Sequence, residues 1–122
     1  KGSEAVHEAP DFFAALRSVG YPLEPVFCGG GNRTLQDREQ WSSGCNLFAV
    51  RPGTVLAYAR NEATLGELTR AGFRVVPSVN FLAFDDWAEA KHRTVITIDG
   101  TELARGGGGP RCMTLPIRRA PP

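Results

Sequence analysis

The sequence predicts an α+β fold in which helices pack on short mixed sheets. Residues 45–50 and 54–58 are apolar or β-prone, and Pro52-Gly53 between them favours a turn, so we expect a β-hairpin here. Residues 62–71 are predicted to form a helix, and a further strand is expected over 73–76. Strand, strand, helix and strand therefore follow one another in a single stretch.

The elements before the hairpin are expected to be short. Residues 1–9 are polar without periodicity, which is typical of a disordered or tag-like N-terminus. Apolar residues at helical spacing over 12–19 predict an amphipathic helix that ends at Gly20. A short strand is expected over 26–28, running into a turn at the glycines 29–31. No Lys-Ser or Lys-Thr follows these glycines, so a nucleotide-binding loop is not indicated.

The polar segment 33–43 is predicted to form one helical turn and a loop. Within it, Arg38 and Glu39 are expected to form an ion pair, and Trp41 is expected to pack against the domain. We assign no catalytic role to these three residues. Asn61, which directly precedes the next helix, has a side chain that favours an N-cap.

The second half of the predicted domain, which spans 10–118, contains an insertion. Gly72 is a suitable residue to end the helix that precedes it. Residues 78–92 then form the insertion, whose apolar and acidic side chains favour a further amphipathic helix. The β-prone run 94–98 follows as a second candidate strand, and residues 119–122 are expected to be an exposed tail.

Composition excludes several classes of protein. With 122 residues, 42% hydrophobic residues and a formal net charge of +1, the chain suits one folded domain and does not suggest disorder or a nucleic-acid surface. No apolar run reaches the roughly 20 residues of a membrane span, and no signal peptide is apparent. An odd number of cysteines favours a reducing cytoplasm over a disulfide framework. No metal site is expected, because the cysteines and histidines lack zinc-ligand spacing.

The strongest chemical signal is Cys112, which follows the four glycines 106–109. Glycines leave room for a ligand and allow a loop to move. Arg105 and Arg111 flank the thiol, and nearby cations favour the nucleophilic thiolate. The alternative is that Cys112 is a small apolar residue at the start of a buried strand over 113–117.

Three ordered motifs resemble arginine deiminases and together cover most of residues 26–118. Residues 102–116 resemble the C-terminal nucleophile motif Glu-Leu-x-Arg-Gly-x-Gly-Gly-x-x-Cys-Met-x-x-Pro. Residues 30–46 resemble Gly-Gly-Asn, Arg-Glu-Gln-Trp and Gly-x-Asn of the same enzymes, and a third match lies within 52–72. The resemblance is carried by several motifs in the right order, which is far more specific than any one of them.

The resemblance implies a fold, a reaction and three site residues. Arginine deiminases adopt the pentein α/β-propeller, so this chain would be a partial propeller built from ββαβ-type units. They hydrolyse L-arginine to L-citrulline and ammonia through a Cys thiolate, without metal or organic cofactor. Cys112 matches the nucleophile, Asn46 a substrate-contacting Asn, and Gly106 a position whose backbone lies near the substrate. L-Arginine or a related guanidino compound is therefore the implied ligand.

The resemblance also shows what this chain lacks. No His-x-Asp occurs in it, and 122 residues cannot hold five propeller units, so we expect a C-terminal fragment that is inactive without the remainder of a parent chain. Met113 is the only Met, so the chain is expected to be processed, truncated or tagged. Gly107 stands where typical members carry Arg, which leaves arginine selectivity open.

Other functions remain open at this point. They are a non-catalytic homologue that binds arginine-like ligands or a protein partner, an amidinotransferase or other guanidine hydrolase, and an ordinary structural domain. Pairing of the chain with itself through an exposed strand edge is also open, because unpaired edge strands favour such association.

Overall fold

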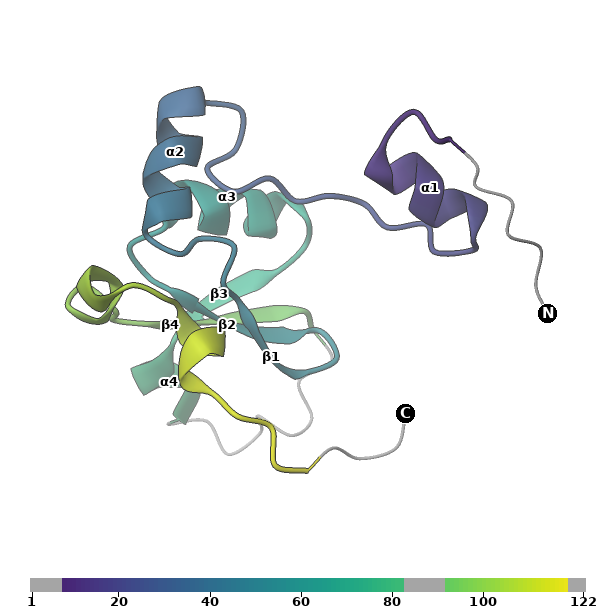
Figure 1. Cartoon of the computed structure of the whole chain (residues 1–122). Coiled ribbons are helices and arrows are strands. Elements are labelled where there is room, and N and C mark those ends of the chain that lie inside the picture. Colours follow the sequence, from purple (N-terminus) through teal and green to yellow (C-terminus); the bar gives the residue numbers. More distant parts are fainter. Residues whose placement is uncertain (1–7, 83–91, 119–122) are drawn as a thin grey trace.

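A four-stranded sheet lies at the centre of the computed structural model, which describes residues 8–82 and 92–118 (Figure 1). In chain order the elements are α1 (Phe12–Ser18), α2 (Arg33–Trp41), β1 (Phe48–Arg51), β2 (Thr54–Tyr58), α3 (Glu62–Arg70), β3 (Arg74–Pro77), α4 (Ser78–Leu82), β4 (Thr94–Ile98), and the 3-10 helices η2 (Leu103–Gly106) and η3 (Pro110–Met113). The predicted α+β class is confirmed.

The sheet is mixed, with strand order β1-β2-β4-β3. β1 and β2 form the predicted antiparallel hairpin, while β4 lies parallel to both β2 and β3. The chain thus leaves β2 through α3, forms β3 at the edge of the sheet, and returns to place β4 between them. Both candidate strands, 73–76 and 94–98, are therefore strands in the structure.

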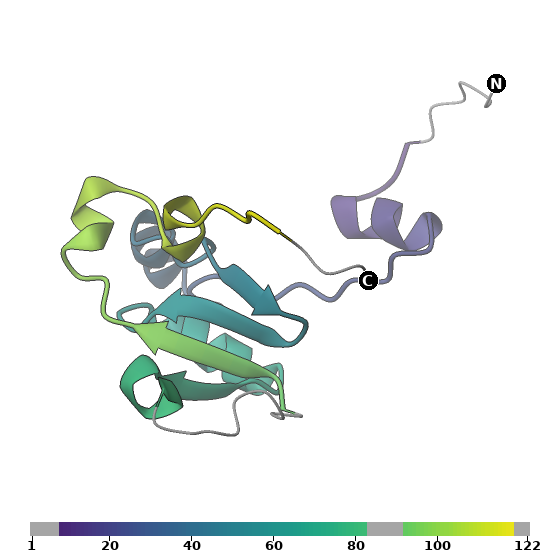
Figure 2. The same ribbon diagram turned by 90° about the horizontal axis from the view of Figure 1, so that it is seen from below.

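The core lies between the sheet and α3. Ala57, Leu68 and Val95 form a buried cluster, with further apolar side chains packed around it. Burying each larger aliphatic side chain stabilises the fold by about 1.5–3 kcal/mol. On the opposite face, α4 contacts β3 and β4, and η3 contacts β1 and β2, as Figure 2 also shows. β4 is covered on both faces, whereas the central residues of the edge strand β1 are exposed.

The helices agree with their predicted ends, except that α2 is longer than predicted. Asp11 caps α1 by accepting a hydrogen bond from the Ala14 backbone N–H at 2.8 Å. α2 spans nine residues rather than one turn. It begins after Asn32, whose side chain accepts from the Leu35 backbone N–H. Gly72 follows α3 with φ +88, the left-handed conformation expected of a residue that ends a helix.

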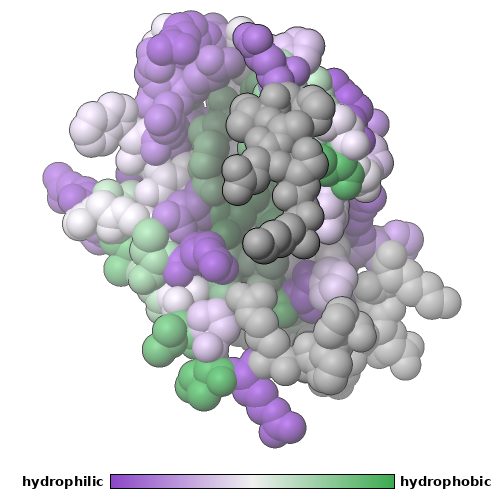
Figure 3. Space-filling view, turned by 45° about the vertical axis from the view of Figure 1, so that its right-hand side comes forward, coloured by the Kyte–Doolittle hydropathy of each residue, from purple (hydrophilic) through white to green (hydrophobic). Residues whose placement is uncertain are grey.

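Two predicted strands are absent from the described residues. Residues 26 and 27 form no regular element and Cys28 begins a turn, while 113–117 begin in η3 and continue as irregular chain. Both strands were predicted from apolar character alone, yet neither stretch pairs with an edge strand of the sheet, β1 or β3. Exposed apolar side chains occur in both stretches. Figure 3 shows, for one face of the molecule, that hydrophobic residues reach the surface beside hydrophilic ones.

Several predictions fall outside the described residues. These are most of the N-terminus 1–9, the tail 119–122, and the part of the insertion from 83 to 91. The described beginning of the insertion forms α4, and its end is the exposed His92. Among the helices of the described part, none is long and apolar enough to cross a membrane.

Candidate functional site

The predicted nucleophile Cys112 lies in η3 and not at the start of a strand. Pro110 occupies the first turn of η3 and is buried, which suits a residue that has no backbone N–H to satisfy. The Cys112 side chain is exposed, and its thiol is free. The alternative of a small residue entering a buried strand is therefore wrong for this position.

Asn46 reaches the thiol from the loop that precedes β1. Its Nδ2 donates to Cys112 Sγ at 2.9 Å, and its Oδ1 accepts from the Arg111 backbone N–H at 3.1 Å. One side chain thus holds both the sulfur and the backbone next to it. Two residues that are 66 positions apart, and that were singled out separately in the sequence, are in direct contact.

The surroundings of Cys112 favour its thiolate. A backbone hydrogen bond from Gly109 is the main cause that lowers the pKa of the thiol, followed by the bond from Asn46, and the charge of Arg111 adds the smallest contribution. Arg105, the other predicted cation, instead pairs with Glu102 at 3.1 Å. Hydrogen bonds to the sulfur therefore matter more here than the flanking arginines on which the prediction was based.

The glycine loop approaches the site through Gly108 and Gly109, which the sequence did not single out from their neighbours. A methyl group at Gly109 would lie 2.6 Å from Asn46 Cβ, and one at Gly108 would lie 3.4 Å from Cys112 Sγ. A methyl group at Gly106, in contrast, would meet nothing within 4 Å. The predicted role of Gly106 beside a substrate stays a prediction.

Gly107 has a backbone conformation of φ 80 and ψ 154. This region of conformational space is essentially restricted to glycine. An Arg at this position, as in typical arginine deiminases, would be strained here. The departure from the family motif therefore agrees with the conformation that the loop adopts.

Tyr58 anchors the loop to the sheet. This buried residue ends β2, and its hydroxyl donates to the Gly108 carbonyl oxygen at 3.4 Å. Its ring also packs so closely on Gly100 that any side chain at that position would overlap it. The site consequently lies at the carboxyl end of the parallel strands, whereas His92 precedes β4 and lies at the opposite end.

An open groove of about 510 Å³ lies next to the thiol loop. Its lining residues come from α2 and from the glycine loop: Asp37, Gln40, Trp41, Gly107 and Gly108. Trp41 is 88% exposed, so the prediction that it packs against the domain is wrong. The reason is that α2 turns its Glu39 side toward α3 and its Trp41 side toward solvent.

The predicted ion pair between Arg38 and Glu39 is present at 3.2 Å. The prediction missed that Glu39 is completely buried and bonds mainly to α3. Burial raises the pKa of Glu39, but the hydrogen bonds from Thr64, Ala63 and Arg38 outweigh it and hold the pKa below its ordinary value. No local sequence signal could have shown this, because the partners lie some 25 residues further along the chain.

Comparisons with known proteins agree with the resemblance. The arginine deiminase family model matches residues 6–119. The chain is 38% identical over 102 residues to arginine deiminase of Mycoplasma capricolum, a match that covers 84% of this chain and 20% of the relative. Against arginine deiminases of Mycobacterium marinum and Mycobacterium avium it is 37% and 36% identical, over 93% and 95% of this chain and 23% and 24% of theirs. The chain thus spans about a fifth to a quarter of the length of these relatives.

Proposed function

Because this chain belongs to the arginine deiminase family, we propose that it carries the nucleophile of a hydrolase that converts L-arginine and water into L-citrulline and ammonia. The observation that supports this most directly is the contact between Asn46 and Cys112. It joins the two residues that match functional positions of the family motifs, and it favours the thiolate that the reaction needs.

In the proposed reaction, the Cys112 thiolate attacks the guanidinium carbon of the substrate. The new C–S bond forms as one C–N bond breaks, and the leaving nitrogen takes up a proton and departs as ammonia. Water then adds to the same carbon, the C–S bond breaks, and citrulline and the thiolate are released. Hydrogen bonds from Asn46 and Gly109 hold the sulfur in its charged form before the attack.

Proton transfer is the part of this reaction for which the described residues place no imidazole beside Cys112. A general acid must protonate the leaving nitrogen, and a base must activate water. Among the described residues the only imidazole is that of His92, at the far end of β4. We therefore propose that the remainder of a parent chain supplies the acid, the base and the carboxylates that bind the guanidinium, and that this chain alone is inactive.

The same proposal extends to the architecture. In the parent, the mixed sheet and its helices would be one part of a pentein α/β-propeller. Apolar side chains that are exposed here support packing against further structure, among them Tyr21, Leu23, Phe27, Leu115 and Ile117. Removing such side chains from water would stabilise the parent by about 25 cal/mol for each Å² of apolar surface that is buried.

A changed guanidino substrate is the second candidate function. It is favoured by Gly107, since an Arg of the family motif is missing from a loop whose backbone now suits only glycine. The reaction would stay the same, with Cys112 attacking a related amidine carbon.

The test is citrulline formation from L-arginine by the parent protein and by this chain, each with a Cys112→Ala control. Activity in the parent that the substitution abolishes is the expected result. A folded parent that forms no citrulline, yet releases ammonia from another guanidino compound through Cys112, would favour the second candidate. A folded parent inactive on every guanidino compound would overturn both.

A further inference from the structure

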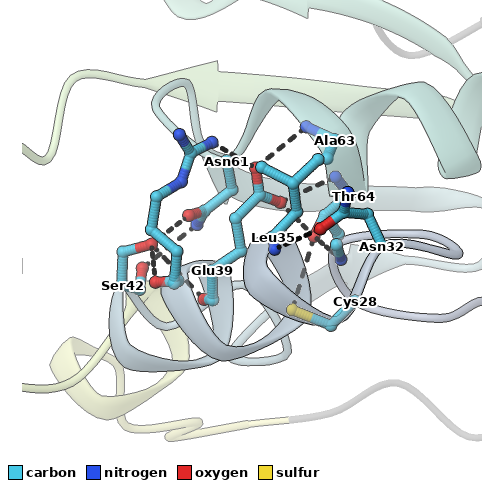
Figure 4. Close-up of polar contacts among 10 residues, drawn as sticks. Cys28, Asn32, Leu35, Glu39, Ser42, Asn61, Ala63 and Thr64 are labelled. Carbon is cyan, nitrogen blue, oxygen red and sulfur yellow. Dashed lines mark hydrogen bonds and ion pairs between the residues drawn. The ribbon is translucent and has the colours of Figure 1, made fainter.

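Glu39 is a buried carboxylate for which the proposed reaction has no use. Its oxygens accept hydrogen bonds from the backbone N–H groups of Ala63 and Thr64, at 2.9 and 2.8 Å, and from Thr64 Oγ1 at 2.6 Å. These donors belong to the first turn of α3, whose N–H groups have no partner within the helix (Figure 4). A side chain of α2 therefore caps α3.

This arrangement leaves Asn61 available for another contact. Asn61 occupies the N-cap position of α3, as predicted, but its side chain makes no cap hydrogen bond. Instead its Nδ2 donates to the Ser42 carbonyl oxygen at 3.1 Å, and its Oδ1 accepts from the Ser42 hydroxyl. Both residues are buried, and Figure 4 shows them beside Glu39. The two helices are thus joined by a polar junction at the end of α2.

From this junction a tight turn leads to the site. The Gly44 N–H donates to the Glu39 carbonyl oxygen at 2.7 Å, Ser43 adopts φ 62, and the Asn46 N–H donates to the Ser43 carbonyl oxygen at 3.0 Å. Gly44 has no room for a side chain, because a methyl group there would lie 2.6 Å from Cys28 Sγ. The position of Asn46 is therefore fixed by backbone bonds that begin at the last turn of α2, and the Glu39 carboxylate holds this end of α2 on α3.

We propose that Glu39 is a positioning residue for Cys112: by capping α3 it fixes the turn over 42–46, and that turn places Asn46 so that its amide donates to the sulfur. The proposal rests on the proposed function for the importance of Cys112. The chain of contacts that it uses does not depend on any reaction.

The test measures the thiol directly. We would follow alkylation of Cys112 by iodoacetamide from about pH 6 to about pH 10, using peptide mass spectrometry to separate it from Cys28 and Cys45. The variants are Glu39→Gln, Asn46→Ala and the two combined. Arg111 is the charged side chain that acts on this thiol, and it is unchanged in all of them.

We expect each single substitution to slow Cys112 alkylation at pH 7 by about two- to fivefold, because the sulfur loses a donor to its charged form. If Glu39 acts through Asn46, the double variant is no slower than Asn46→Ala alone. An unchanged rate in Glu39→Gln, or effects that multiply in the double variant, would overturn the proposal.

Two controls separate positioning from loss of stability. Glu62→Gln removes a carboxylate from the same end of α3, but one that is exposed, and it should leave alkylation unchanged. Val76→Ala opens the core at β3, away from the junction, and should lower the melting temperature without slowing alkylation. If Val76→Ala slows alkylation as much as Glu39→Gln does, the effect is a general loosening of the fold and the proposal fails.

If Glu39→Gln does not fold, Thr64→Ala provides the second variant. It removes one donor to the carboxylate, together with the acceptor of the Gly29 N–H, and keeps both backbone bonds to Glu39. A smaller slowing in the same direction is therefore expected, with Thr64→Ser restoring the rate. No slowing in a folded Thr64→Ala would count against the proposal. None of these readouts requires turnover of arginine, so the positioning of the thiol and the proposed function can fail separately.

Discussion

The α2–α3 junction and the glycine loop that carries Cys112 use hydrogen bonds in opposite ways. At the junction a charged group is completely buried, and its two oxygens are satisfied by several donors. In the loop an exposed thiol receives a bond from one side chain and one from the backbone. A buried carboxylate that is fully bonded makes a fixed support, whereas a reactive group must stay accessible to a substrate.

The contrast also concerns how the two regions depend on each other. The loop is held by Tyr58, which ends β2, and by Asn46, which lies in the segment between α2 and β1. Nothing in the described junction relies on a bond from the loop. Changes at the junction should therefore reach the thiol, and changes at the thiol should leave the junction intact.

The largest effect on stability is expected from Glu39→Ala. Loss of the cap leaves backbone donors and the buried Thr64 hydroxyl without their acceptor, which should lower the free energy of unfolding by about 2–4 kcal/mol. Urea unfolding of this chain measures it. The exposed Glu62→Ala should cost less than about 1 kcal/mol. Equal losses in the two variants would remove the distinction between a buried cap and a surface charge.

The pH dependence of stability gives a second test of the same carboxylate. Because the pKa of Glu39 is lower in the folded chain than its ordinary value, its contribution is present at neutral pH and is lost as the pH falls through the folded-state pKa. The melting temperatures of the unchanged chain and of Glu39→Gln should therefore converge on acidification below about pH 4. If the difference between the two melting temperatures stays constant well below about pH 4, the charge of Glu39 contributes nothing to stability.

Gly109→Ala should disturb the loop and spare the junction. Its methyl group would lie 2.6 Å from Asn46 Cβ and 2.9 Å from the Asn46 carbonyl oxygen, so the loop must move away from Asn46. We expect Cys112 alkylation at pH 7 to slow about threefold, with a loss of stability of about 1–3 kcal/mol. Gly106→Ala is the matched control, because its methyl group meets nothing within 4 Å. Equal alkylation rates in the two variants would contradict this reading of the loop.

The smallest effect is expected from Arg111→Gln. The charge of Arg111 contributes least among the causes that lower the pKa of Cys112, and both side chains are exposed. Alkylation should slow by less than about twofold, and less again at high salt, because ions screen exposed charges. Arg105→Gln should have no effect, since that guanidinium pairs with Glu102. If Arg111→Gln slows Cys112 alkylation more than Asn46→Ala does, charge and not hydrogen bonding controls the pKa of the thiol.

Sequence patterns predicted most of the regular structure. The hairpin around Pro52-Gly53, the helix that ends before Gly72 and the strand 94–98 all depend on local preferences that their own residues express. The strands predicted over 26–28 and 113–117 failed because a strand also needs a partner, and local apolar character does not provide one. The length of α2 was not predicted because its polar sequence has no clear helical periodicity, and the contact of Glu39 with α3 is tertiary.

For the site, motif resemblance singled out Cys112 and Asn46, and the fold brings them into contact. It gave no reason to select Gly109 over the other glycines, because the closeness of Asn46 exists only once β1 and the loop are both in place. Trp41 was expected to pack against the domain, but the direction in which α2 docks leaves it exposed.

By itself, the sequence determined the succession of hairpin, helix and strands over residues 45–98, the turn at Pro52-Gly53, and the thiol that the proposed chemistry requires. Each of these depends on a residue and its near neighbours along the chain. Only the tertiary structure decided that β4 lies between β2 and β3, that Glu39 caps a helix other than its own, and that Asn46 meets Cys112. Such contacts join residues far apart in sequence, and packing of the whole sheet with its helices is what brings them within hydrogen-bonding distance.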